Sequence, residues 1–214
     1  MLSSTATTLD WPSPARFALA LVIAFTLTLI MAGAWGRTLI ESLIPVTRTM
    51  LGWMDDRFDI LLLSVTHDRQ DSVVQLRVNL ATLLVMGGQV LAPHRGGWLE
   101  VTTTLGAMLQ PLVIAPAIAA ALPGRGVARL TRFGIAALLS LGFLVIDLPL
   151  TLYAYVWDML VQKLDPTRFS LLLAWHEFLH AGGRLGVSVL LAWLARGIES
   201  SLIKYMVSRQ TRGH

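Results

Sequence analysis

Residues 17–35 have the sequence FALALVIAFTLTLIMAGAW, an apolar run without a charged side chain that is bracketed by Arg16 and Arg37. At about 1.5 Å per residue, a helix of this length spans a hydrocarbon core of about 30 Å. The run therefore predicts a transmembrane helix over 17–36. Residues 32–34 resemble a signal-peptide cleavage site, but the run exceeds the usual apolar core of about 7–15 residues, which favours an uncleaved anchor.

Three further apolar runs, 105–122, 133–161 and 171–195, are also long enough to span. The 214-residue chain is 55% hydrophobic and 14% charged, which is too apolar for a soluble domain. The absence of cysteine excludes a disulfide framework and thiol catalysis. We expect a mainly α membrane protein in the lipid bilayer, with four transmembrane helices and a small β-rich extracytoplasmic insertion between helices 1 and 2.

Charge placement predicts the orientation. The segment 123–132 carries three arginines and no acid, and the tail 196–214 is also basic, so both are expected on the cytoplasmic side together with residues 1–16. The insertion 37–104 and the turn 162–170 then face outward, in a multi-pass inner-membrane protein whose two termini are cytoplasmic. Because the basic residues lie at helix ends, they indicate topology, and we expect no nucleic-acid partner.

The outer insertion changes character along its length. Residues 38–54 form an amphipathic stretch interrupted by Pro45, which predicts a helix lying on the membrane surface. From residue 58 the periodicity shortens, and a polar break at 67–71 separates two runs that predict a β-hairpin. Shorter candidate strands at 89–92 and 98–104 follow glycine-rich turns.

The last two predicted spans carry ionisable side chains, which are costly in lipid and need partners. These residues are Asp147, Asp158, His176, Glu177, His180 and Arg184. If the turn between the spans is centred near Asp165, Asp147 and Arg184 lie at nearly equal depth, which predicts an intramembrane ion pair. Residues spaced by about four on each helix share a face, so we expect two polar stripes to meet in a buried polar seam.

The segment His176-Glu177-Phe178-Leu179-His180 matches the pattern H-E-x-x-H. On a helix, two histidines at this spacing can bind one zinc ion, and the glutamate can accept a proton from metal-bound water. The segment thus resembles the signature of zinc metallopeptidases, including the intramembrane site-2 type.

A catalytic zinc needs a third protein ligand. The intramembrane family usually supplies an aspartate downstream of the motif, and here only the tail follows. Glu199 lies 19 residues after His180, about 28 Å away on a continuous helix. Asp158, or alternatively Asp147, remains as the candidate third ligand. Zinc is thus a possible cofactor. We prefer the structural interpretation, in which the polar seam holds the last two helices together, to the interpretation as a zinc site.

The layout of the whole chain resembles small membrane proteins associated with bacterial exosortases, especially those of the exosortase H type. The features that carry this resemblance are the single anchor, the β-like segment around 73–80 that leads into Leu105, Asp158 in the third helix, and Trp175 and Glu177 in the fourth. The resemblance implies a non-enzymatic accessory subunit of an envelope protein-sorting or secretion machine, bound to a larger membrane-protein partner. The alternative is a membrane-embedded zinc metallopeptidase with Glu177 as its catalytic base.

Overall fold

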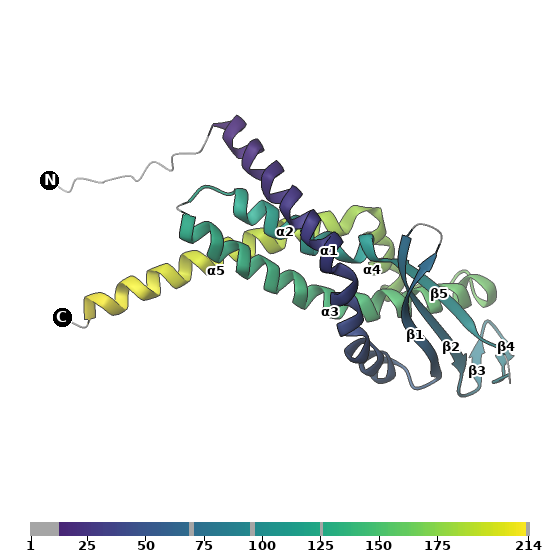
Figure 1. Ribbon diagram of the computed structural model, residues 1–214. Helices are drawn as coiled ribbons and strands as arrows, with labels where there is room; N and C mark the ends of the chain where they lie inside the picture. The colour runs from purple at the N-terminus through teal and green to yellow at the C-terminus, as the bar shows by residue number, and fades with distance from the viewer. Residues whose placement is uncertain (1–12, 69–70, 95–96, 125, 213–214) are drawn as a thin grey trace.

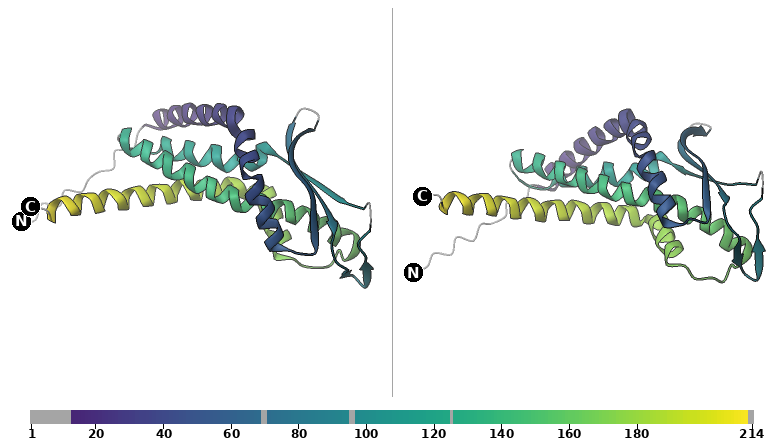
Figure 2. Two further views of the ribbon diagram at one scale, coloured as in Figure 1. Left: turned by 60° about the horizontal axis from the view of Figure 1, so that its bottom comes forward. Right: turned by 90° about the horizontal axis from the view of Figure 1, so that it is seen from below.

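Most of the helical segments run along one axis, and the β-strands gather at one end of them (Figure 1). The computed structural model describes residues 13–68, 71–94, 97–124 and 126–212. The last turn of α5 lies at the end opposite the sheet (Figure 2). The prediction of a mainly helical chain, with helices able to cross a membrane and a small antiparallel β unit, is confirmed.

The first helix, α1 (Pro14–Met54), joins two segments that the sequence analysis separates. The expected surface helix over 38–54 is the second half of α1, which continues through Pro45. A proline inside a helix costs about 3 kcal/mol. Packing outweighs this cost, because the second half of α1 lies against β1 and α3 and fully buries Ile40. Figure 2 shows α1 changing direction along its length, so that its later part lies beside the sheet.

The sheet has the strand order β1-β2-β5, with both pairs antiparallel, over β1 (Phe58–Asp68), β2 (Asp71–Leu80) and β5 (Leu99–Thr104). The predicted hairpin is therefore present. The central strand β2 buries Val74 and Leu76, with 0% and 1% exposure.

A second hairpin pairs β3 (Leu84–Met86) with β4 (Gln89–Leu91). Sequence analysis predicts β4, as the strand at 89–92, and misses its partner β3. Gly87 and Gly88 both have positive φ, as a two-residue type I′ turn requires.

Helix α2 (Leu105–Ala121) occupies the centre of the bundle, packed against α1, α3 and α5. Its alanines at 115, 117 and 119 are fully buried, which lets neighbouring backbones approach closely. Three helical segments, Pro14–Met54, Gly126–Leu164 and Leu171–Tyr205, are long and apolar enough to cross a membrane. With 17 residues, α2 reaches only about 26 Å, so length and composition do not establish a fourth span.

The last two predicted spans differ from expectation in their bounds. Helix α3 (Gly126–Leu164) begins earlier and ends later than 133–161, so most of the expected basic loop forms its first turns. The expected helix 171–195 is interrupted: α4 (Leu171–Phe178) and α5 (Arg184–Arg212) flank a kink at Leu179–Gly183, where Gly182 has non-helical backbone angles.

Candidate functional site

Asp147 and Arg184 lie together in the interior, where α3 meets the start of α5. Arg184 Nε donates to Asp147 Oδ2 at 3.2 Å, and Arg184 Nη2 donates to Thr151 Oγ1 at 3.1 Å. Thr151 in turn donates to Asp147 Oδ1 at 3.0 Å. The side chains of Asp147 and Arg184 are 1% and 3% exposed. This closed network satisfies both charges inside the bundle.

The kink ahead of Arg184 depends on two consecutive glycines. Gly182 has a φ of +105°, a conformation that side chains rarely adopt. A Cβ on Gly183 would lie 2.6 Å from the carbonyl oxygen of Phe178. The helix is therefore kinked between the two histidines and Arg184, rather than continuous through them.

His176 and His180 are neighbours on the side of the helix that faces α3. Their ring centroids lie 4.4 Å apart, and Tyr155 Oη lies 2.8 Å from His180 Nε2. The Tyr155 ring also meets the His176 ring edge to face, at 4.5 Å between centroids. Buried His176 Nδ1 has no hydrogen-bond partner among the described residues. The two polar stripes thus face each other, as the polar seam requires.

The histidines open onto a cleft of about 510 Å³ between α3 and α4. Its other lining residues are Tyr155, Asp158, Gln162, Leu173 and Glu177. Asp158 Oδ2 accepts a hydrogen bond from Gln162 Nε2 at 2.7 Å, and Glu177 is exposed. The cleft therefore brings together His176, His180, Asp158 and Glu177, which are the candidate metal ligands and the candidate catalytic base. Asp158 is hydrogen-bonded to Gln162 on the same helix.

The zinc hypothesis requires three protein ligands around one point. Within residues 13–68, 71–94, 97–124 and 126–212, no group of three or more histidine, aspartate or glutamate side chains is placed to hold a metal ion. His180 Nε2 is engaged by Tyr155. Glu199, the distant alternative, pairs with Arg132 instead. The arrangement offers two imidazoles and a phenol, which suit hydrogen bonding to a polar group.

A second candidate site is the outward face of the β3–β4 hairpin, formed by Leu83, Val85 and Val90, which we call the hairpin face. Each of the three is 63–66% exposed, and Val85 pairs with Val90 across the hairpin. The opposite face is buried through Leu84 and Met86. The hairpin therefore carries apolar side chains on both faces, although only one of them is covered.

An apolar cleft of about 260 Å³ lies beside this hairpin, between the sheet and the end of α3. Trp98 stands at its rim with 56% exposure, and Lys163 provides a positive charge there. The guanidinium of Arg77 lies 5.9 Å from the Trp98 ring and pairs with Glu100 at 2.7 Å. Hydrogen bonds from Gln75 and from Arg77 hold the pKa of Glu100 below its ordinary value.

Sequence analysis missed a polar junction where α1 ends against α3. Asp55 accepts hydrogen bonds from Arg57 and, at 2.7 Å, from Tyr153 Oη. Burial raises the pKa of Asp55, but these hydrogen bonds outweigh it and leave the pKa below its ordinary value. Asp55 and Tyr153 are 98 positions apart, and a local pattern gives no signal for such a contact.

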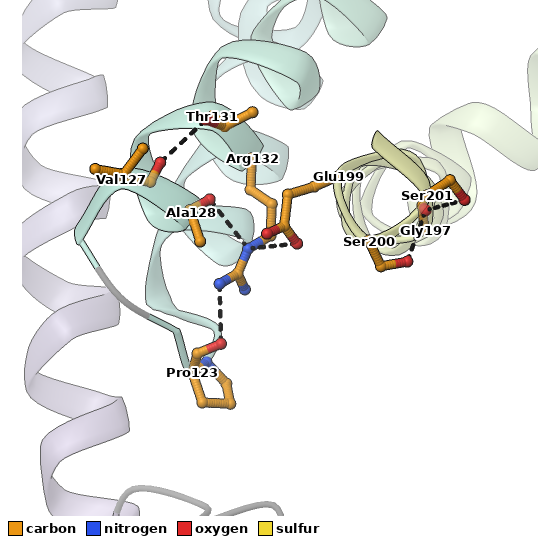
Figure 3. Close-up of polar contacts among 9 residues, drawn as sticks. All are labelled: Pro123, Val127, Ala128, Thr131, Arg132, Gly197, Glu199, Ser200 and Ser201. Atoms are coloured by element: carbon orange, nitrogen blue, oxygen red, sulfur yellow. Dashed lines mark hydrogen bonds and ion pairs between the residues drawn. The ribbon is translucent and has the colours of Figure 1, made fainter. Parts of the chain in front are cut away.

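The other contact that sequence analysis missed is the ion pair between Arg132 and Glu199. Arg132 Nε lies 3.5 Å from Glu199 Oε2, and the two side chains are 2% and 10% exposed. Figure 3 shows the Arg132 guanidinium between the start of α3, the loop at Pro123 and α5. Sequence analysis favours a role in topology for Arg132 over contact with anionic lipid head groups, and the structure buries its side chain.

Comparison of the chain with protein-family models, with curated proteins and with solved structures gave no match.

Proposed function

We propose that the chain is a non-enzymatic accessory subunit of a bacterial envelope protein-sorting or secretion machine. It docks on a larger membrane-protein partner. The observation that carries the proposal is the hairpin face: Leu83, Val85 and Val90 are exposed although they lie outside the described helices. Apolar groups exposed together on a water-facing surface are typical of interaction sites.

The length of α3 supports a position of this surface outside the hydrocarbon core. Its 39 residues extend about 58 Å, nearly twice the thickness of the core. The cleft beside the hairpin is lined by Leu160, Lys163 and Leu164 from the last turns of α3. Contact with lipid therefore does not explain why the valine side chains are exposed, whereas contact with the apolar surface of a protein partner does.

We place the protein in the inner membrane with four crossings, both termini cytoplasmic and the sheet outside. The fourth crossing is α2, whose buried alanines and central position suit a short helix enclosed by longer ones. Because the chain lacks cysteine, single-cysteine variants report topology cleanly. In intact cells, an impermeant maleimide is expected to label Gln89→Cys and not Lys204→Cys. Labelling of position 204 alone would reverse this orientation.

The docking proposal is tested on full-length protein in its native membranes. A photo-crosslinker on Val85→Cys is expected to capture one membrane protein, which also co-purifies stoichiometrically with the unmodified chain. The double variant Val85→Ser/Val90→Ser should lose that partner. The control Gln89→Ser alters an exposed polar residue of the same hairpin and should keep it. Co-purification that is equal for both variants would contradict docking at the hairpin face.

The second candidate is a membrane-embedded zinc metallopeptidase, favoured by the contact between the rings of His176 and His180 in an open cleft. Its test is the metal content of the purified protein and of the variant His176→Ala/His180→Ala, together with proteolysis by Glu177→Ala. Stoichiometric zinc in the parent only, with proteolysis that requires Glu177, would replace the accessory-subunit proposal.

A further inference from the structure

Positive charge is concentrated at the start of α3, at the end of the bundle away from the sheet. Arg129 and Arg132 occupy successive turns of α3 on one face, and Arg196 of α5 is close enough to repel Arg132 electrostatically. Glu199 is the acid that acts on Arg132 here. Among the described residues, Arg132 thus feels two guanidinium groups and one carboxylate. The positive end of the helix dipole of α3 adds to the excess.

Arg132 is held in place without being fully paired. Its Nε donates to Ala128 O at 3.3 Å, and its Nη2 donates to Pro123 O at 2.9 Å (Figure 3). Nη1 is buried and has no hydrogen-bond partner within the described part of the chain. The side chain is only 2% exposed, so water at the surface does not satisfy this nitrogen.

Arg129, one turn earlier, shows the same deficiency. Its Nε is buried and finds no partner among the residues that the structure describes. The residue as a whole is only partly buried, so a ligand can approach it from the surface. Two guanidinium groups with unpartnered nitrogens on one helix face therefore form a cluster of donors whose natural complement is a tetrahedral oxyanion.

The surrounding backbone is adapted to this cluster. A Cβ on Gly124 would lie 2.0 Å from Arg132 Nη2, so the loop passes very close to the guanidinium. The apolar part of α3 begins at Phe133, directly after the arginines. On a membrane-spanning α3, this boundary lies at the level of lipid head groups, where basic pockets between helices bind anionic lipids.

We propose that Arg129 and Arg132 form a phosphate-binding site at the start of α3, occupied by the phosphate of a lipid head group or by free phosphate. The phosphate oxygens accept hydrogen bonds from Arg129 Nε and Arg132 Nη1. The site lies at the end of the bundle opposite the hairpin face and does not depend on the docking proposal.

The test uses the full-length protein in a neutral detergent, with three additions compared: inorganic phosphate, phosphatidylglycerol and phosphatidylcholine. Ligand retained per protein is measured by native mass spectrometry, and the thermal unfolding midpoint is recorded in parallel. Arg129→Gln removes a donor on a partly exposed side chain. Arg132→Lys keeps the charge and removes the fork of donors. Lys204→Gln is the control, because it removes one exposed positive charge downstream on α5.

Phosphatidylglycerol retention is expected to fall about tenfold in Arg129→Gln, equivalent to about 1.4 kcal/mol, and to stay unchanged in Lys204→Gln. Stabilisation by inorganic phosphate alone would identify the ligand as a free anion. Stabilisation by phosphatidylglycerol alone would identify the ligand as a lipid. Either result supports the site when the stabilisation depends on Arg129. Equal retention by Arg129→Gln and Lys204→Gln would overturn the proposal, as would an absence of phosphate-dependent binding in the parent. The ligand-free unfolding midpoint shows separately whether Arg132→Lys is folded.

Discussion

Removing Arg184 alone should destabilise the bundle more than removing both members of its ion pair. Asp147 is 1% exposed, and the variant Arg184→Met leaves its carboxylate with Thr151 as the remaining neighbour in the network. Breaking a buried pair on one side costs about 3–5 kcal/mol, whereas replacing both partners by apolar groups is often neutral. The double variant Asp147→Leu/Arg184→Met should therefore recover at least about 2 kcal/mol relative to Arg184→Met.

The assay is equilibrium unfolding in mixed detergent micelles, followed by the fluorescence of the seven tryptophans. A double-mutant cycle over the parent, Asp147→Leu, Arg184→Met and the double variant gives the coupling free energy. Arg16→Met is the control, since it removes an exposed arginine from the start of α1. The reasoning is refuted if the double variant loses the sum of the two single losses, because the residues would then act independently.

Three further predictions use the same unfolding assay. Gly182→Ala should cost about 1–2 kcal/mol, because the methyl group strains a backbone at φ +105°, whereas Gly186→Ala in open space should cost nothing. Gly87→Ala should destabilise the protein more than Gly88→Ala does. Both glycines have positive φ, but only a methyl group at position 87 would collide with the main chain at the end of α3. Equal losses of unfolding free energy in the two variants would contradict this contact. The pKa of Asp55 is lower in the folded chain than its ordinary value of 3.8, so its stabilisation is complete above that pH and is lost as pH falls through the folded pKa. Asp55→Asn should flatten this acid limb, and an unchanged limb would exclude Asp55 as its source.

Much of the fold follows from hydropathy and periodicity, because burial in lipid and the alternation of a half-buried sheet both leave a local signature. The runs beginning at 105 and 171 coincide with helix starts, and the hairpin around 67–71 lies where its polar break predicts. Local patterns fail where tertiary packing decides. Pro45 indicates a break that packing against β1 and α3 overrides, and the glycines at 182 and 183 give a kink inside the expected helix 171–195.

The candidate site divides in the same way. Contacts between neighbouring helices, such as that of Asp147 with Arg184, are accessible to sequence analysis because helical spacing and a shared turn fix relative depth. Sequence analysis treats Glu199 only as a candidate zinc ligand beside the histidine motif. Its contact with Arg132 joins segments 67 positions apart, and predicting it requires the packing of α5 on α3.

Buried polar groups without partners and exposed apolar groups indicate where binding would lower the free energy of this chain. In the middle of the bundle, Arg184 is paired and His180 is engaged by Tyr155, but buried His176 Nδ1 has no partner among the described residues. At one end of the bundle, Arg132 retains an unpartnered nitrogen within the described residues, and at the other end Val85 stays exposed. A phosphate group would satisfy the unpartnered nitrogen of Arg132, and a protein partner would cover the exposed hairpin face. Because the two sites are far apart and bind by different chemistry, variants at either site should leave binding at the other intact.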